Sequence, residues 1–162
     1  MNKLQQYLDI HVGWAKEAAR LAPPGEDLPP LLSFADAENH MAMLPIPPGG
    51  NLSRWARDKL EDARAVIYAT VTPAYVVPLD QFEEDVAKRL EEVVVAHGTD
   101  HPEIVPYRRE CIVVSAGDRT RTLFSMFLVE RAGDGRIVGL VECREPAGCW
   151  SGPMADLLVT RH

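Results

Sequence analysis

The sequence predicts an α+β fold: an antiparallel sheet of about five strands that ends in a C-terminal three-stranded meander, with helices packed mainly on one face. Three observations lead to this prediction. Three segments repeat apolar residues at helical spacing, two others have the composition of strands, and the last third holds three strand-like segments joined by Gly-Asp turns. The 162 residues, 46% of them apolar, suit one domain, which we expect to span residues 1–162.

The first helix is predicted over residues 3–22, where apolar side chains recur at steps of three and four: Leu4, Leu8, Val12, Ala15, Ala19 and Ala22. The prolines and glycine at 23–25 end this helix, and the proline-rich linker up to Pro30 should run extended over the surface. Residues 31–46 alternate apolar and polar side chains with an interruption at 35–39, which indicates a strand or a loose hairpin.

A second helix should follow the Pro- and Gly-rich segment 45–50, with Asn51 as its N-cap residue, and should run to about Arg64. The next segment, 66–77, is rich in β-branched and aromatic residues and predicts a strand. Pro73 interrupts this strand, which indicates an edge position or a bend.

The third helix is predicted over residues 80–97. Asp80 and Glu83 form a variant of the capping box, and Gly98 provides a left-handed C-terminal stop. Between them lies a buried stripe at helical spacing, formed by Phe82, Val86, Leu90, Val93 and Val94.

The C-terminal meander is predicted from three strand-like segments, 107–115, 120–131 and 136–144, which are separated by Ala-Gly-Asp turns. The middle segment is apolar on both faces, because Phe127 and Val129 alternate with Met126 and Leu128. One face should meet helices. We expect the other face to meet a further part of this chain or a second copy of it.

Composition and charge exclude several classes of function. The chain has 17 Lys and Arg against 24 Asp and Glu, a formal net charge of −7, so it lacks the broad basic surface that makes nucleic acid a partner. No apolar run reaches the length of a membrane helix, and residues 1–22 do not resemble a secretory signal, so we expect a cytoplasmic protein without a membrane partner. Three cysteines without C-x-x-C spacing indicate reduced thiols, with Cys111 and Cys143 buried and Cys149 exposed in a loop.

Two groups of residues carry the ligand types of a metal site. One is Asp36, Glu38 and His40, and the other surrounds His97 and His101. Gly98 breaks the helix between the two histidines, so they lack the i,i+4 geometry of a helical chelate, and an interaction of His97 with the helix dipole is the favoured interpretation. No cofactor is expected.

Arginines are concentrated in the last third of the chain, although the chain is acidic overall. Arg109 and Arg121 are therefore candidates to bind a small anionic ligand through a carboxylate or phosphate group. The same positive charge could instead face the acidic helix at 80–92 of another subunit, or simply be solvated.

No serine-hydrolase elbow and no phosphate-binding glycine loop occurs in the sequence. The sequence therefore favours a non-catalytic, homodimeric binding or interaction module in which the sheet or its edge forms the contact. The alternative is a metal-dependent hydrolase or lyase that brings Asp36, Glu38 and His40 together with His97 and His101.

Overall fold

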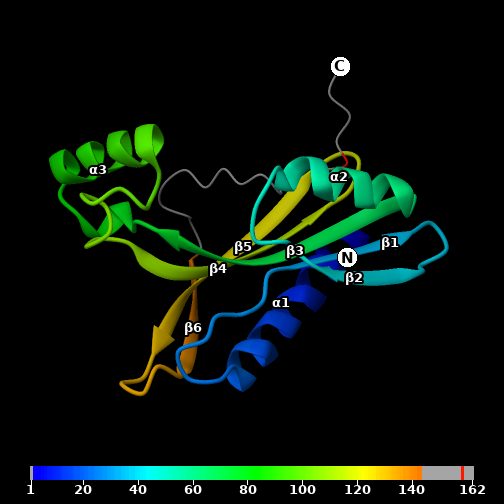
Figure 1. Ribbon diagram of the computed structural model, residues 1–162, viewed down its shortest axis with the longest axis horizontal. Coiled ribbons are helices and arrows are strands. Elements are labelled where there is room, and N and C mark those ends of the chain that lie inside the picture. Colours follow the sequence, from blue (N-terminus) through cyan, green and yellow to red (C-terminus); the bar gives the residue numbers. More distant parts are fainter. Residues whose placement is uncertain (1, 144–157, 159–162) are drawn as a thin grey trace.

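The structure, a computed structural model, describes residues 2–143 and Leu158. Its elements in chain order are α1 (Lys3–Leu21), β1 (Leu31–Asp36), β2 (Met41–Pro45), α2 (Leu52–Asp62), β3 (Ala65–Val76), the short 3-10 helix η1 (Leu79–Gln81), α3 (Glu84–His97), β4 (Arg109–Gly117), β5 (Thr122–Arg131) and β6 (Ile137–Cys143). The strands form one antiparallel sheet in the order β2-β1-β3-β4-β5-β6 (Figure 1). The predicted α+β fold with its C-terminal meander is confirmed, with six strands where we expected about five. None of the described helices is long and apolar enough to cross a membrane.

The helices are divided between the two faces of the sheet (Figure 1), which refines the expectation that they lie mainly on one face. The longest helix, α1, covers one face and contacts β3, β4, β5 and β6. The shorter α2 packs on the opposite face, where Leu60 meets Phe34 and Tyr68. Strand alternation explains the division, because Phe34 points to the α2 face and the next residue, Ala35, joins the core under α1.

The prediction that the middle strand of the meander is apolar on both faces is confirmed. Phe127 of β5 lies in the core beneath α1, whereas Met126 and Leu128 lie on the other face with Cys111 and Val113 of β4. Within the described chain, the members of that second group come from strands alone.

The α3 helix stands beyond the ends of β3 and β4, at the opposite end of the molecule from the β1–β2 hairpin (Figure 1). It packs against η1 and shares a small core of its own, formed by Val77, Leu90 and Ile104.

The predicted helix start at residue 80 was wrong. Asp80 lies in the 3-10 helix η1, and α3 starts at Glu84, because the 3-10 turn places Leu79 and Phe82 against the small core. Gly98 ends α3 at φ +79°, as the sequence predicted.

Pro73 occupies a position on β3 that tolerates proline. Pairing of β1 with β3 reaches only to Val71, whereas β4 continues along β3 as far as Val76. Beyond Val71, β3 therefore has β4 on one side and no described strand on the other, which confirms the predicted edge position for this part of the strand.

Candidate functional site

The first predicted metal group forms the turn between β1 and β2. The Oδ1 atom of Asp36 accepts hydrogen bonds from the backbone N–H groups of Glu38 and His40, both at 2.9 Å. These bonds hold the pKa of the Asp36 carboxyl below its ordinary value, and the bond from His40 has the largest effect. The second oxygen of Asp36 lies 3.0 Å from Nδ1 of His40, whose side chain is exposed. This carboxylate is therefore occupied in closing the turn.

The second predicted group lies at the C-terminal end of α3. The imidazole rings of His97 and His101 are stacked, with centroids 4.9 Å apart and planes at 28°. The Nδ1 atom of His101 accepts a hydrogen bond from the backbone N–H of Glu103 at 3.2 Å. The nitrogen lone pairs lie in the ring planes, so two nearly parallel rings do not aim them at one ion.

The structure does not bring these two groups together. His40 and Glu38 belong to the β1–β2 hairpin at one end of the molecule, and His97 and His101 belong to the α3 end (Figure 1). Among residues 2–143 and Leu158, no three His, Cys, Asp or Glu side chains are arranged to hold a metal ion.

Arg109 and Arg121, the predicted anion-binding residues, also lie apart. Arg109 is the first residue of β4, and Arg121 lies in the turn beyond the last residue of that strand, Gly117. Eight steps of about 3.4 Å separate Arg109 from Gly117, so the two positions are about 27 Å apart along the sheet. The backbone of Arg121 closes the turn through two hydrogen bonds with Asp118.

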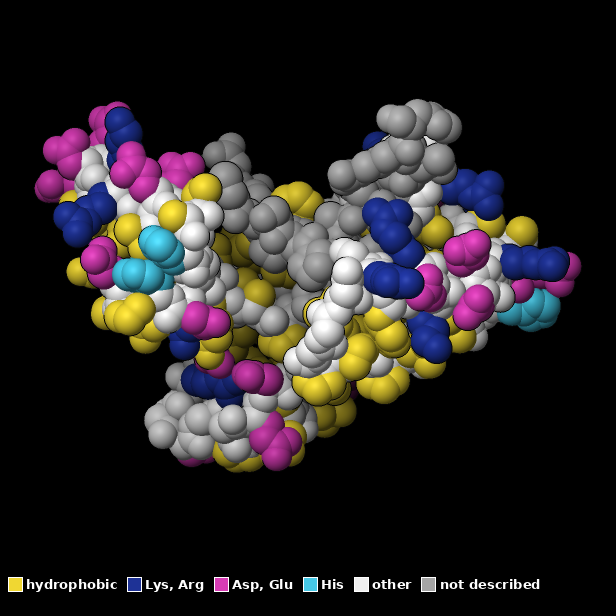
Figure 2. All heavy atoms as spheres, turned by 45° about the horizontal axis from the view of Figure 1, so that its top comes forward, with side chains coloured by type: hydrophobic (Ala, Val, Ile, Leu, Met, Phe, Trp, Pro, Cys, Tyr) yellow, Lys and Arg dark blue, Asp and Glu magenta, His cyan; other side chains and the backbone are white. Residues whose placement is uncertain are grey.

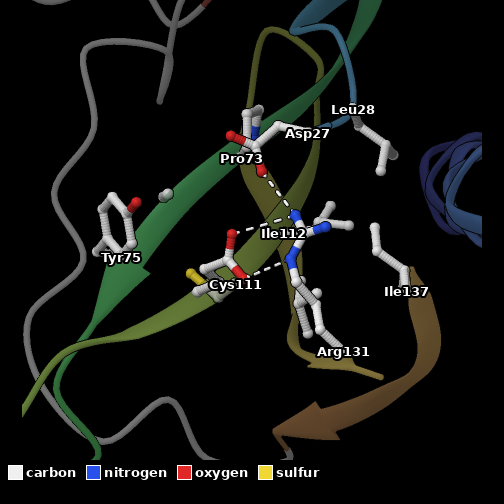
Figure 3. A pocket seen from close by; sticks show the side chains of 11 residues that line it. Asp27, Leu28, Pro73, Tyr75, Cys111, Ile112, Arg131 and Ile137 are labelled. Carbon is white, nitrogen blue, oxygen red and sulfur yellow. Dashed lines mark hydrogen bonds and ion pairs between the residues drawn. The ribbon is translucent and has the colours of Figure 1, made fainter. Parts of the chain in front are cut away.

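The arginine with the most partners in the structure is Arg131, which the sequence did not single out (Figure 3). Its Nε donates to Oε2 of Glu110 at 2.7 Å, its Nη2 to Oδ1 of Asp27 at 2.9 Å, and its Nη1 to the carbonyl oxygen of Gly135 at 2.7 Å. The hydrogen bond that Arg131 donates to Glu110 raises the pKa of the Arg131 guanidinium. Arg131 thereby holds the linker before β1 against the sheet.

A small pocket of about 150 Å³ adjoins Arg131 (Figure 3). Its lining includes Tyr75, Cys111 and Ile112. Because each terminal nitrogen of the guanidinium already has a protein acceptor, Arg131 has a structural role here and is not a free anion-binding group.

Two buried titratable side chains have local structural explanations. His11 lies on the buried face of α1, with its Nδ1 atom 2.8 Å from the carbonyl oxygen of Tyr7, and burial lowers its pKa. Burial also raises the pKa of the Cys111 thiol to about 12, which confirms its prediction as a small core residue. Cys149 lies outside the described residues.

Among the described residues, β6 forms the longer of the two edge strands of the sheet. β6 is the last strand in the sheet order, and no described strand pairs with its outer side. It has seven residues with a single charge, Glu142, and the side chains of Val138 and Val141 are 59% and 47% exposed. The opposite edge strand, β2, has only five residues and ends in Pro45.

A groove of about 320 Å³ runs between α1 and β6. Lys16, Ala19 and Arg20 line its α1 side, and residues 137–140 line its β6 side. The open strand edge and this groove form one continuous surface, which we call the β6 surface. Comparisons with protein-family models, curated proteins and solved structures found no match to this chain.

Proposed function

We propose that this protein is a non-catalytic interaction module that works as a homodimer joined through the β6 surface. The open backbone edge of an apolar, seven-residue strand carries the proposal. Unpaired N–H and C=O groups along such an edge bind readily to another strand, and natural edge strands are usually protected by lysine, proline or short length. Glu142 is the one charged residue in β6.

A two-fold axis through Leu140 gives the pairing that uses the whole strand. In this antiparallel register, Leu140 faces Leu140 of the partner subunit, and Glu142 faces Val138 of the partner subunit. This register spans the whole strand, including Val138, which has no partner in β5 because the β5–β6 register shifts there. The two Glu142 carboxylates stay apart, which matters because like charges directly opposite each other destabilise a strand pair.

The charges beside the strand support the same register. Glu142 lies directly opposite Phe127 of β5, so it points to the face on which Lys16 lies 5.4 Å from the Phe127 ring centroid. The groove beside Val138 is lined by Lys16 and by Arg20, which also pairs with Glu17. In the proposed dimer, each Glu142 therefore enters the groove of the other subunit on the side of Lys16.

The proposal includes a cytoplasmic location and no nucleic-acid partner, in keeping with the net charge of −7. A metal-dependent hydrolase or lyase stays the alternative prediction, and the separation of its two histidine groups gives it no support. A small anionic ligand of Arg109 or Arg121 would have to bind at one of these positions alone.

The test is a charge reversal at one exposed position of β6. Val138→Glu places a carboxylate opposite Glu142 of the partner subunit, whereas Val138→Lys places a cation there. Two such pairs occur in each dimer, so we expect Val138→Glu to weaken the dimer by about 1–2 kcal/mol, roughly five- to thirty-fold in Kd. Val138→Lys should stay at least as tight as the unchanged protein. Light scattering over a dilution series measures the dissociation.

Met43→Glu on the opposite edge strand is the matched control, because Met43 is similarly exposed at 44%. It should leave the dimer intact. A strictly monomeric unchanged protein would contradict the proposed function, and equal effects of the two Val138 variants would contradict the register.

A further inference from the structure

A second surface, independent of the β6 surface, lies at the α3 end of the molecule. The α3 helix and the segment 103–107 enclose a groove of about 610 Å³, which we call the α3 groove. Its apolar lining residues are Val86, Leu90, Pro106 and Tyr107. Phe82 contacts the Tyr107 ring edge-on, with centroids 5.6 Å apart and planes at 87°. The aromatic wall of the groove is therefore already positioned.

Two apolar residues that line the groove are partly exposed. Val86 is 43% exposed and Tyr107 is 45% exposed. The small core beneath α3 buries only Val77, Leu90 and Ile104. The helix thus has apolar side chains that the chain itself does not cover, which is typical of a docking surface.

The α3 end is also the acidic part of the protein. Residues 79–108 contain eight Asp and Glu against three Lys and Arg, so they carry a net charge of −5 of the chain's −7. Figure 2 shows acidic side chains gathered over this end of the molecule. Two of the three cations pair with carboxylates of the same segment, 79–108. Arg89 pairs with Glu103 at 3.4 Å, and Arg108 pairs with Asp100 at 2.8 Å. The excess negative charge therefore surrounds an apolar groove.

We propose that the α3 groove binds a basic amphipathic helix of a partner protein. An apolar groove selects a helix that presents apolar side chains on one face. The negative charge around it selects lysine or arginine on the flanks of that face and disfavours an acidic helix. Asp85, Glu103 and Arg89 also line the groove, and because Arg89 pairs with Glu103, Asp85 gives the lining its net negative charge.

The probe is a fluorescein-labelled amphipathic peptide built from leucine and lysine alone, with a matched peptide in which every lysine is replaced by glutamate. Fluorescence anisotropy measures binding to the full chain. We expect the lysine peptide to bind at least about tenfold more tightly than the glutamate peptide. Val86→Arg, which places a cation in the groove, should weaken binding of the lysine peptide by about tenfold or more.

Met43→Arg is the matched control, because Met43 and Val86 are exposed to 44% and 43% and lie at opposite ends of the molecule. It adds the same charge and should leave binding unchanged. Tyr107→Ser is a second groove variant, which removes apolar area without changing the charge, and it should also weaken binding. Equal losses for Val86→Arg and Met43→Arg, or unchanged binding by Tyr107→Ser, would overturn the proposal, because binding would then depend on net charge alone.

Discussion

At the scale of single residues, His11 links the folding of the protein to pH. Its ring is 3% exposed, and burial lowers its pKa, so the folded state disfavours the charged imidazole. Below a pH of about 6.5, the unfolded chain protonates His11 more readily than the folded protein does. The contribution of neutral His11 to the free energy of unfolding is fully present above this pH. It is lost as the pH falls toward the lower pKa that His11 has in the folded protein.

We therefore expect the free energy of unfolding to fall between pH 7 and pH 5, and His11→Gln to make this fall smaller. Urea unfolding at several pH values measures how steeply the free energy of unfolding changes with pH in the unchanged protein and in His11→Gln. An unchanged slope in His11→Gln would show that other groups cause the pH dependence.

Single residues also show what the sequence could not predict. Gly117 belongs to an Ala-Gly-Asp turn, where glycine commonly provides a positive φ. Gly117 does not have a positive φ, and the structure gives a different reason for glycine at this position. A Cβ atom on Gly117 would clash with the Tyr68 ring. Tyr68 belongs to β3 and is distant in sequence, so this close approach depends on strand register, which the turn pattern does not contain.

At the scale of elements, the meander and the first two helices were predictable because local signals define them. Turn glycines, an N-cap at Asn51 and apolar spacing act within a few residues of one another. The start of α3 was missed because the D-x-x-E pattern also fits the 3-10 turn that precedes the helix. The ion pairs of Arg131 were missed because its carboxylate partners, Glu110 and Asp27, lie 21 and 104 residues away in sequence.

The ion pairs of Arg131 hold the linker before β1 in place. We expect Arg131→Met to destabilise the protein by about 1–2 kcal/mol, because it removes charge-assisted hydrogen bonds to Glu110 and Asp27. Arg131→Lys should recover only part of this loss, since one ammonium cannot reproduce the fork of the guanidinium. Urea unfolding measures both changes, and Arg121→Met in a surface turn should cost less than about 0.5 kcal/mol. A loss of that small size for Arg131→Met would show that the linker is held by other contacts.

At the scale of the whole molecule, the structure has two parts that differ in how much apolar surface they bury. The sheet with α1 and α2 has extensive cores on both faces, whereas α3 packs on η1 and a core of three buried residues. Local unfolding follows such differences in burial, so the α3 end should open without the sheet. This arrangement also suits the proposed α3 groove, because a bound helix would stabilise the less stable part.

Hydrogen exchange tests this division. Leu90→Ala removes a buried side chain from the small core and should cost about 2 kcal/mol or more, which speeds exchange of the α3 amides about thirtyfold while α1 and the strands keep their protection. Leu8→Ala removes a comparably buried leucine from the face of α1 that packs on the sheet, and it should lower protection throughout the sheet. If Leu90→Ala instead weakened α1 and β4 as much as α3, the protein would unfold as one cooperative unit. In that case the α3 end and the sheet would unfold together, because destabilising the small core would also destabilise the ends of β3 and β4.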